Sequence, residues 1–180
     1  MYVDIRKCVA APFLAYGIAA HAAPITYIGT LSGPAESPPN ASPGIGQTTV
    51  IADSVALTLR VQVSFGGLLG PTTGAHIHCC TTSAGSGVAG VATTVPAFPG
   101  FPLNVTSGTC DSTLSLIDAS SYNPSYVTAS GGIAAAEAAL LTGIAAGKAY
   151  LNIHSSLFPG GEIRSFLVAD RIFRNGLESS

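Results

Sequence analysis

The clearest pattern in the chain is the alternation of apolar and polar residues across SVALTLRVQVSF, residues 54–65. Every second residue from Val55 to Phe65 is apolar, and the residues between them are polar except for Ala56. Successive side chains of a β-strand point to opposite faces, so this period predicts a strand with one face in a core and the other in water. Strands of this kind are typical of antiparallel sheets.

Shorter segments of similar character follow along the chain, separated by turns rich in glycine and proline. The strands predicted from them cover 24–33, 47–53, 75–80, 88–95 and 112–118, and a closing hairpin covers 149–156 and 161–169. Between the strand over 112–118 and the closing hairpin, the alanine and leucine residues of IAAAEAALLTGIAA predict an α-helix over 133–146. Gly143 is a possible kink in this helix, and Gly147 ends it. The fold class is therefore all-β: a Greek-key antiparallel β-sandwich with one inserted α-helix near 133–146.

Composition bounds the size and class of the protein. The chain has 180 residues, of which 9% are charged, and its net charge is -2. This length and the absence of a linker suggest one domain with a sizeable core. The low charge, together with the lack of any cluster of lysine and arginine, excludes a nucleic-acid-binding surface.

The N-terminal segment has the organisation of a secretory signal. Arg6 and Lys7 precede a mostly apolar run from Cys8 to Ala20, and Ala20-His21-Ala22 fits a cleavage site. We therefore expect a signal peptide over 1–22, a domain over 23–170 and a short C-terminal tail over 171–180. The protein would be secreted or periplasmic, with no membrane span after cleavage. The alternative is that the apolar run is retained as an anchor.

The histidines left in the predicted mature chain are His76, His78 and His154, and each lies on a predicted strand. His76 and His78 are two residues apart, so they point to one face with their bases roughly 6–7 Å apart. Two imidazoles at this spacing can bind one ion, and His154 completes a minimal site. Imidazole suits copper or zinc better than calcium or magnesium, so the candidate cofactor is copper. The alternative is that the rings only hydrogen-bond to backbone carbonyls.

The cysteines of the mature chain are Cys79, Cys80 and Cys110, and an oxidising compartment permits disulfides. We expect Cys79 or Cys80 to pair with Cys110, which closes a loop of about 30 residues and contributes about 3 kcal/mol. A bond between the adjacent Cys79 and Cys80 is the alternative. Cys80 points to the same face as His78, which makes it a further candidate ligand for copper(I).

Arg164 lies in PGGEIRSFL, on the hairpin strand that pairs with the strand of His154. A guanidinium close to a metal can guide a small anion. The competing interpretation is a salt bridge to Glu162, its neighbour on the same strand face.

Two blocks of the chain, GAHIHCCTTSAGSGVAGVATTVPAFPGFP and GKAYLNIHSSLFPGGEIRSFL, resemble the CHRD (chordin-type) domain. The shared pattern is A-H-I-H in the first block and G-x-A-Y-x-N-I-H followed by P-x-G-E-I-R in the second. Where that family often has glycine after E-I-R, this chain has Ser165. The resemblance spans nearly the whole predicted mature chain. It implies a secreted, all-β module rather than an enzyme.

A weaker resemblance links His76, His78, His154 and Arg164, in this order, to copper/zinc superoxide dismutases. It implies a superoxide dismutase-like sandwich, with an immunoglobulin-like one as the alternative. The chain has no histidine between His78 and His154 that would bridge copper to zinc, and it has no zinc-ligand cluster.

The leading hypothesis is an exported CHRD-domain binding module that holds copper, with a metal ion or an extracellular protein as its partner. A copper-dependent superoxide dismutase-like enzyme and a structural cell-envelope or matrix protein without a metal are the alternatives. The oligomeric state stays open.

Overall fold

The computed structural model describes residues 23–170, and its strands form one antiparallel sheet that curls into two layers. The hydrogen-bonded order is β4-β6-β7-β1-β2-β3-β5, with β8 beside β1. The strands are β1 (Ile25–Ser32), β2 (Ile45–Asp53), β3 (Thr58–Gly66), β4 (Thr72–His78), β5 (Gly108–Ser115), β6 (Tyr150–Ser155), β7 (Ile163–Phe166) and β8 (Val168–Ala169). The predicted signal peptide over 1–22 and tail over 171–180 lie outside the described residues.

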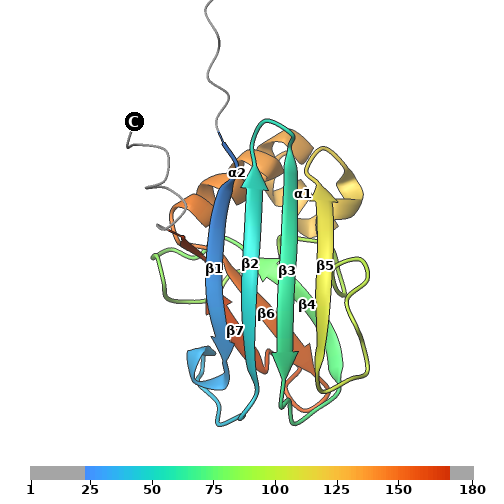
Figure 1. Cartoon of the computed structure of the whole chain (residues 1–180). Helices are drawn as coiled ribbons and strands as arrows, with labels where there is room; N and C mark the ends of the chain where they lie inside the picture. Colours follow the sequence, from blue (N-terminus) through green and yellow to red (C-terminus); the bar gives the residue numbers. More distant parts are fainter. Residues whose placement is uncertain (1–22, 171–180) are drawn as a thin grey trace, which may run out of the picture.

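The two layers face one another as a sandwich. Figure 1 shows β1, β2, β3 and β5 side by side in one layer, with β4, β6 and β7 crossing behind them. β1 and β7 join the layers through the single register pair of Ser32 and Arg164. The chain crosses between layers from β3 to β4 and again from β4 to β5. The predicted all-β, antiparallel sandwich is therefore confirmed.

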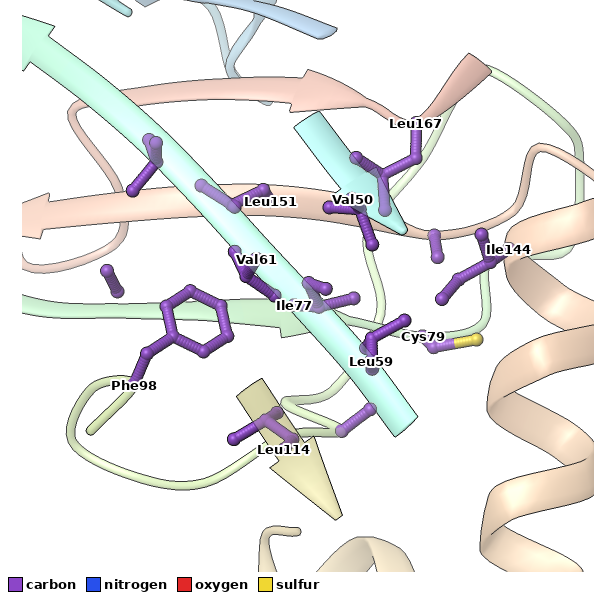
Figure 2. Packing of buried hydrophobic residues seen from close by; sticks show 14 of the residues in the cluster. Val50, Leu59, Val61, Ile77, Cys79, Phe98, Leu114, Ile144, Leu151 and Leu167 are labelled. Carbon is purple, nitrogen blue, oxygen red and sulfur yellow. The ribbon is translucent and has the colours of Figure 1, made fainter. Parts of the chain in front are cut away.

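The core lies between the layers and is made by the apolar half of each alternating strand. Leu59 and Val61 of β3 face Ile77 of β4 and Leu151 of β6, as Figure 2 shows. All four side chains are completely buried. Ile77 and Leu151 point inward, so the histidines that alternate with the inward-facing residues of β4 and β6 point to the outer face of the layer formed by β4, β6 and β7.

The predicted strand over 54–65 is too long at its start. Residues 54–57 form the turn between β2 and β3, where the Asp53 carboxylate accepts hydrogen bonds from the N–H groups of Val55 and Ala56. Leu57 has a φ of 53°, and Val55 is exposed. The apolar alternation continues into this turn, but the hydrogen bonds to Asp53 stabilise the turn rather than a strand.

The predicted strand over 88–95 is also wrong, because this segment forms only isolated bridges. It nevertheless runs along the free edge of β4, where the N–H groups of Ala92 and Thr93 donate to the carbonyl of Ile77. The edge of β4 is thus covered, and the segment lies close to the histidine face.

Two helices close one end of the sandwich (Figure 1). The predicted helix is confirmed as α2 (Ile133–Ala145), which continues through Gly143 without a break. A second helix, α1 (Pro124–Ser130), was not predicted; Asn123 caps it by accepting a hydrogen bond from the N–H of Ser125. Single turns of 3₁₀-helix occupy Gly33–Ala35 and Ala119–Ser121. Within residues 23–170, no single helix has the length and apolar composition of a membrane span; α1 and α2 reach it only together, across a bend of 94°.

Candidate metal centre

The pairing of β4 with β6 brings the three histidines onto one surface. His76 lies opposite Asn152, His78 lies opposite Tyr150, and His154 lies opposite Gly74. A Cβ at Gly74 would collide with the carbonyl oxygen of Pro96, so the glycine leaves room for that carbonyl. The ring centroids of His76 and His154 are 4.6 Å apart.

The three rings converge. The centroids of His76 and His78 are 4.8 Å apart and those of His78 and His154 are 5.8 Å apart. One ring nitrogen from each histidine lies within 4.8 Å of the other two, the only group of this kind among residues 23–170. In a closed site with metal–nitrogen bonds of about 2.0–2.1 Å, the nitrogens would be roughly 3.3–3.6 Å apart. The most distant pair would therefore have to approach by up to about 1.5 Å on binding.

A backbone carbonyl fixes each ring through its Nδ1 atom. His76 Nδ1 lies 3.2 Å from the oxygen of Pro96, His78 Nδ1 lies 2.8 Å from that of Ala89, and His154 Nδ1 lies 2.9 Å from that of Pro159. A carbonyl only accepts hydrogen bonds, so each Nδ1 must carry the proton. The neutral ring then presents an unprotonated Nε2, the tautomer that metal-binding histidines adopt.

The three Nε2 atoms are buried and have no hydrogen-bond partner. His76 and His78 are themselves buried, and His154 is partly buried. Unpartnered polar atoms in a protein interior are rare and costly. Three of them on converging rings fit an ion held by three imidazoles, which is a ligand set for copper or zinc.

Electrostatics keep these rings neutral. Burial lowers the pKa of His76 to about 3, with His154 and His78 nearby adding to the effect, although the bond to Pro96 opposes it. Burial likewise lowers the pKa of His78 to about 4, against the opposing bond to Ala89. The pKa of His154 is also lowered by burial. The lone pairs therefore stay free of protons at neutral pH.

The side chain of Tyr150 supports His78. The ring of Tyr150 stacks on that of His78, with centroids 4.7 Å apart and planes inclined by 6°. The Tyr150 hydroxyl donates to the carbonyl of Ala89, 3.3 Å away, and accepts from the Ala89 N–H at 3.2 Å. The carbonyl of Ala89 thus joins both rings, and Tyr150 fixes the orientation of His78.

Arg164 packs behind Tyr150 and not toward solvent. Its Cζ atom lies 4.7 Å from the centre of the Tyr150 ring. Its Nε donates to the carbonyl of Ala35 at 2.5 Å and its Nη1 to that of Gly87 at 3.0 Å. The side chain is buried, so the structure places it as a support of the loops around the site. This environment gives no support to the anion-guiding role considered from the sequence.

The predicted salt bridge between Arg164 and Glu162 is wrong, because each side chain has other partners. Arg164 Nε lies 3.8 Å from Oε2 of Glu36, a residue that no pattern in the sequence singled out. Burial raises the pKa of Glu36 to about 7, although Arg164 opposes that shift. The Oε1 atom of Glu36 and the Oδ1 atom of Asn152 are buried without a partner.

The predicted disulfide to Cys110 is wrong as well. Cys79 is bonded to Cys80, and Cys110 is a free, buried thiol on β5 that faces the core. Both sulfurs of the pair lie against Gly143 of α2, where any Cβ would collide with them. A sulfur held in a disulfide is not a thiolate ligand. Cys80 is therefore not placed as a fourth ligand in this oxidation state.

A comparison with protein families finds a match. A family model described as CHRD domain matches residues 27–167, a range that includes all three histidines, Arg164 and the cysteine pair. No curated protein matches the chain significantly, and no solved structure does.

Proposed function

This chain belongs to the CHRD domain family, and we propose that it is an exported binding module that holds a metal ion between His76, His78 and His154. Copper is the ion that we propose first. The binding would be reversible and would need no other part of the protein than the outer face of β4 and β6 with the loops that anchor the three rings.

One observation carries this proposal. Each of the three rings is fixed through Nδ1 by a backbone carbonyl and leaves a buried, unpartnered Nε2 beside the other two. Histidines that serve only as structural residues would find a donor for Nε2 or expose it to water. One metal ion would bind the lone pairs of all three Nε2 atoms at once.

The ligand set favours copper. Neutral imidazole nitrogens bind copper and zinc well and bind calcium and magnesium poorly. In the usual affinity series of divalent metals copper(II) stands above zinc. When bound, the ion would supply a positive charge that the neutral rings lack, and the buried surroundings would restrict its exchange with solvent.

A dismutase is not our proposal, because nothing in the geometry favours it. The guanidinium of Arg164 is bound to the carbonyls of Ala35 and Gly87 and stacked on Tyr150. Its Nε and Nη1 donors are therefore bound to backbone carbonyls and not directed at the histidines.

Titration of the full chain with copper(II) and with zinc(II), followed by calorimetry, tests the proposal. We expect one ion per chain, and we expect His76→Ala and His154→Ala to lower the affinity by at least about 100-fold, more than the loss of a supporting residue causes. His21→Ala is the matched control, because it removes the remaining histidine of the sequence, which lies in the predicted signal peptide. Equal and weak binding by all four proteins would refute a metal centre and leave the module without a metal.

A further inference from the structure

The Cys79–Cys80 disulfide lies directly beside the metal centre along the chain. His78 is the last residue of β4, and the pair follows it. The N–H of Cys79 donates to the carbonyl of Gly90, 3.1 Å away, while Nδ1 of His78 is bound to the carbonyl of Ala89. The ligand and the disulfide therefore anchor the same short stretch of loop.

The two cysteines differ in their access to solvent. Cys80 is exposed and Cys79 is buried. A groove of about 380 Å³ between this loop and α1 reaches Cys79, with Gly90, Val91 and Tyr126 on its walls. The sulfur of Cys80 packs toward α2, near the carbonyl of Ala139, so a small thiol reagent would approach the pair from the solvent side of Cys80 or through the groove beside Cys79.

On the opposite side the pair has no room. Both sulfurs pack against the backbone of α2 at Gly143, a residue with no side chain; Figure 2 shows the sulfur of Cys79 directed toward this helix. Once the sulfurs are no longer bonded, they must separate to van der Waals contact, and α2 blocks that movement on its side. The chain at Cys79 and Cys80 must then shift, and it is continuous with His78.

We propose that the Cys79–Cys80 pair is a thiol–disulfide exchange site whose reduction loosens the metal centre. This inference rests on the proposed function. In oxidising surroundings the disulfide holds the end of β4 against α2 and keeps His78 in position. Reduction releases that end, and the affinity for the ion falls.

The exchange is a two-electron reaction with an external dithiol. Its thiolate attacks Sγ of the exposed Cys80, the bond to Cys79 breaks, and Cys79 leaves as a thiolate that takes up a proton. The second thiol of the reagent then attacks the mixed disulfide and releases Cys80, which also ends as a thiol. The reagent is oxidised to its cyclic disulfide, and the protein gains two electrons and two protons.

The first arm of the test measures the exchange alone. The full chain carrying Cys8→Ser and Cys110→Ser has no other thiols, so every thiol counted after treatment with dithiothreitol belongs to the pair. We expect two thiols per folded chain within minutes, with an unchanged circular dichroism spectrum. A pair that reacts only after denaturation would overturn the proposal.

The second arm measures the coupling to the metal centre. After removal of the reagent, the oxidised and reduced forms are titrated with zinc(II), which is not reduced by thiols. We expect the reduced form to bind at least about tenfold more weakly, the loss typical of a disturbed supporting residue, and to recover on reoxidation. Cys79→Ala/Cys80→Ala, which has no thiol to bind zinc, should bind as weakly as the reduced form.

Each outcome separates the two proposals. Equal affinity of the oxidised and reduced forms, or tighter binding by the reduced one, would overturn the coupling while leaving the three-histidine site intact. If the oxidised form binds neither zinc(II) nor copper(II), the proposed function fails and the coupling fails with it, whereas the thiol count still reports on the exchange.

Discussion

Glu36, in the loop between β1 and β2, and Glu162, just before β7, are both buried, yet we predict that the same substitution acts on them in opposite directions. Glu162 is completely buried and accepts hydrogen bonds through both carboxylate oxygens. Glu36 is also buried, but its Oε1 atom has no partner. Glu→Gln removes the charge from each with almost no change of shape, so the pair isolates the effect of the surroundings.

The negative charge of Glu162 is stabilised by hydrogen bonds to both carboxylate oxygens. Oε1 accepts from the hydroxyl of Ser42 and from the N–H of Leu69, each at 2.6 Å, and Oε2 accepts from the N–H of Gly70 at 3.3 Å. Burial alone would raise the pKa of Glu162, but the hydrogen bonds from Ser155, Ser42 and the two N–H groups outweigh it and lower the pKa. A glutamine must turn its NH₂ toward at least one of these donors. Hydrogen bonds to a charged group are worth about 1.5–3 kcal/mol each, so Glu162→Gln should lower the free energy of unfolding by about 2–4 kcal/mol at pH 8.

For Glu36 the charge is poorly compensated, and burial raises its pKa to about 7 from the ordinary value of 4.5. As the pH rises from 4.5, the unfolded chain loses this proton before the folded protein does, so the stability that is fully present below pH 4.5 is lost as the pH rises through 7. One pKa unit corresponds to about 1.4 kcal/mol, so the shift bounds the effect at roughly 3 kcal/mol. Glu36→Gln should be nearly neutral at pH 5 and should stabilise the protein by about 1–3 kcal/mol at pH 8.

Urea unfolding of the metal-free protein at pH 5 and pH 8, followed by circular dichroism, measures both effects. Because the lowered pKa of Glu162 gives stability that is present above pH 4.5 and lost as the pH falls below it, the loss in Glu162→Gln should shrink in acid. If both variants shift the midpoint in the same direction at pH 8, the distinction between a compensated and an uncompensated buried carboxylate is mistaken.

Three further results are expected. Gly143→Ala should lower the free energy of unfolding by at least about 1–3 kcal/mol, the cost of overpacking, because the new Cβ collides with both disulfide sulfurs; a gain, as for an exposed helix glycine, would contradict the packing. Tyr150→Phe should cost about 1 kcal/mol in urea unfolding, since it removes both hydroxyl bonds to Ala89. The metal-free protein should lose stability as the pH falls from about 6.5 toward 4, by up to about 1.4 kcal/mol per pH unit for each buried histidine. The reason is that histidines of the unfolded chain become protonated in this range, whereas His76 and His78 in the folded protein, with pKa values of about 3 and 4, stay neutral. His76→Leu should reduce the slope of the unfolding free energy against pH.

Periodicity predicted the elements that bury one face. The alternation around Leu59 and Val61 and the inward direction of Leu151 and Ile153 follow from a period of two residues, and these residues form the core. The placement of His154 on the opposite face of its strand follows from the same rule. That three rings from two paired strands would meet was therefore predictable in outline, because strand neighbours approach within a few ångströms once the hairpin and register are set.

The supporting contacts could not be predicted, because they join segments with no shared local pattern. Glu36 lies in a loop rich in proline and serine and reaches Arg164 only through the fold. The carbonyls of Ala89, Pro96 and Pro159 that orient the histidines are backbone groups of loops, and any residue type carries such a group. By contrast, α1 was signalled by Asn123 followed by proline, a capping residue before a favoured first position.

The disulfide shows how the fold can override an argument from chain entropy. A bond to Cys110 would close a longer loop and restrict the unfolded chain more, which favours it on sequence grounds. In the fold, Cys110 pairs in register with Val63 of β3, whereas Cys79 follows β4 and lies against α2. The two thiols are thus assigned to different layers, and Cys79 is left with its neighbour Cys80 as a partner.

The three unpartnered Nε2 atoms connect the stability of the sandwich with its proposed function. Leaving a buried polar atom without a partner is unfavourable by about 1–3 kcal/mol, so each of the three Nε2 atoms would be stabilised by a partner. Protonation does not relieve this cost, because burial holds the pKa values of His76 and His78 near 3 and 4. Ring rotation does not relieve it either, since each Nδ1 would then lose its carbonyl. An ion that binds the folded state alone stabilises it by about 2.7 kcal/mol at a free concentration 100 times its Kd. An ion held by the three rings, as we propose, would therefore stabilise the folded sandwich.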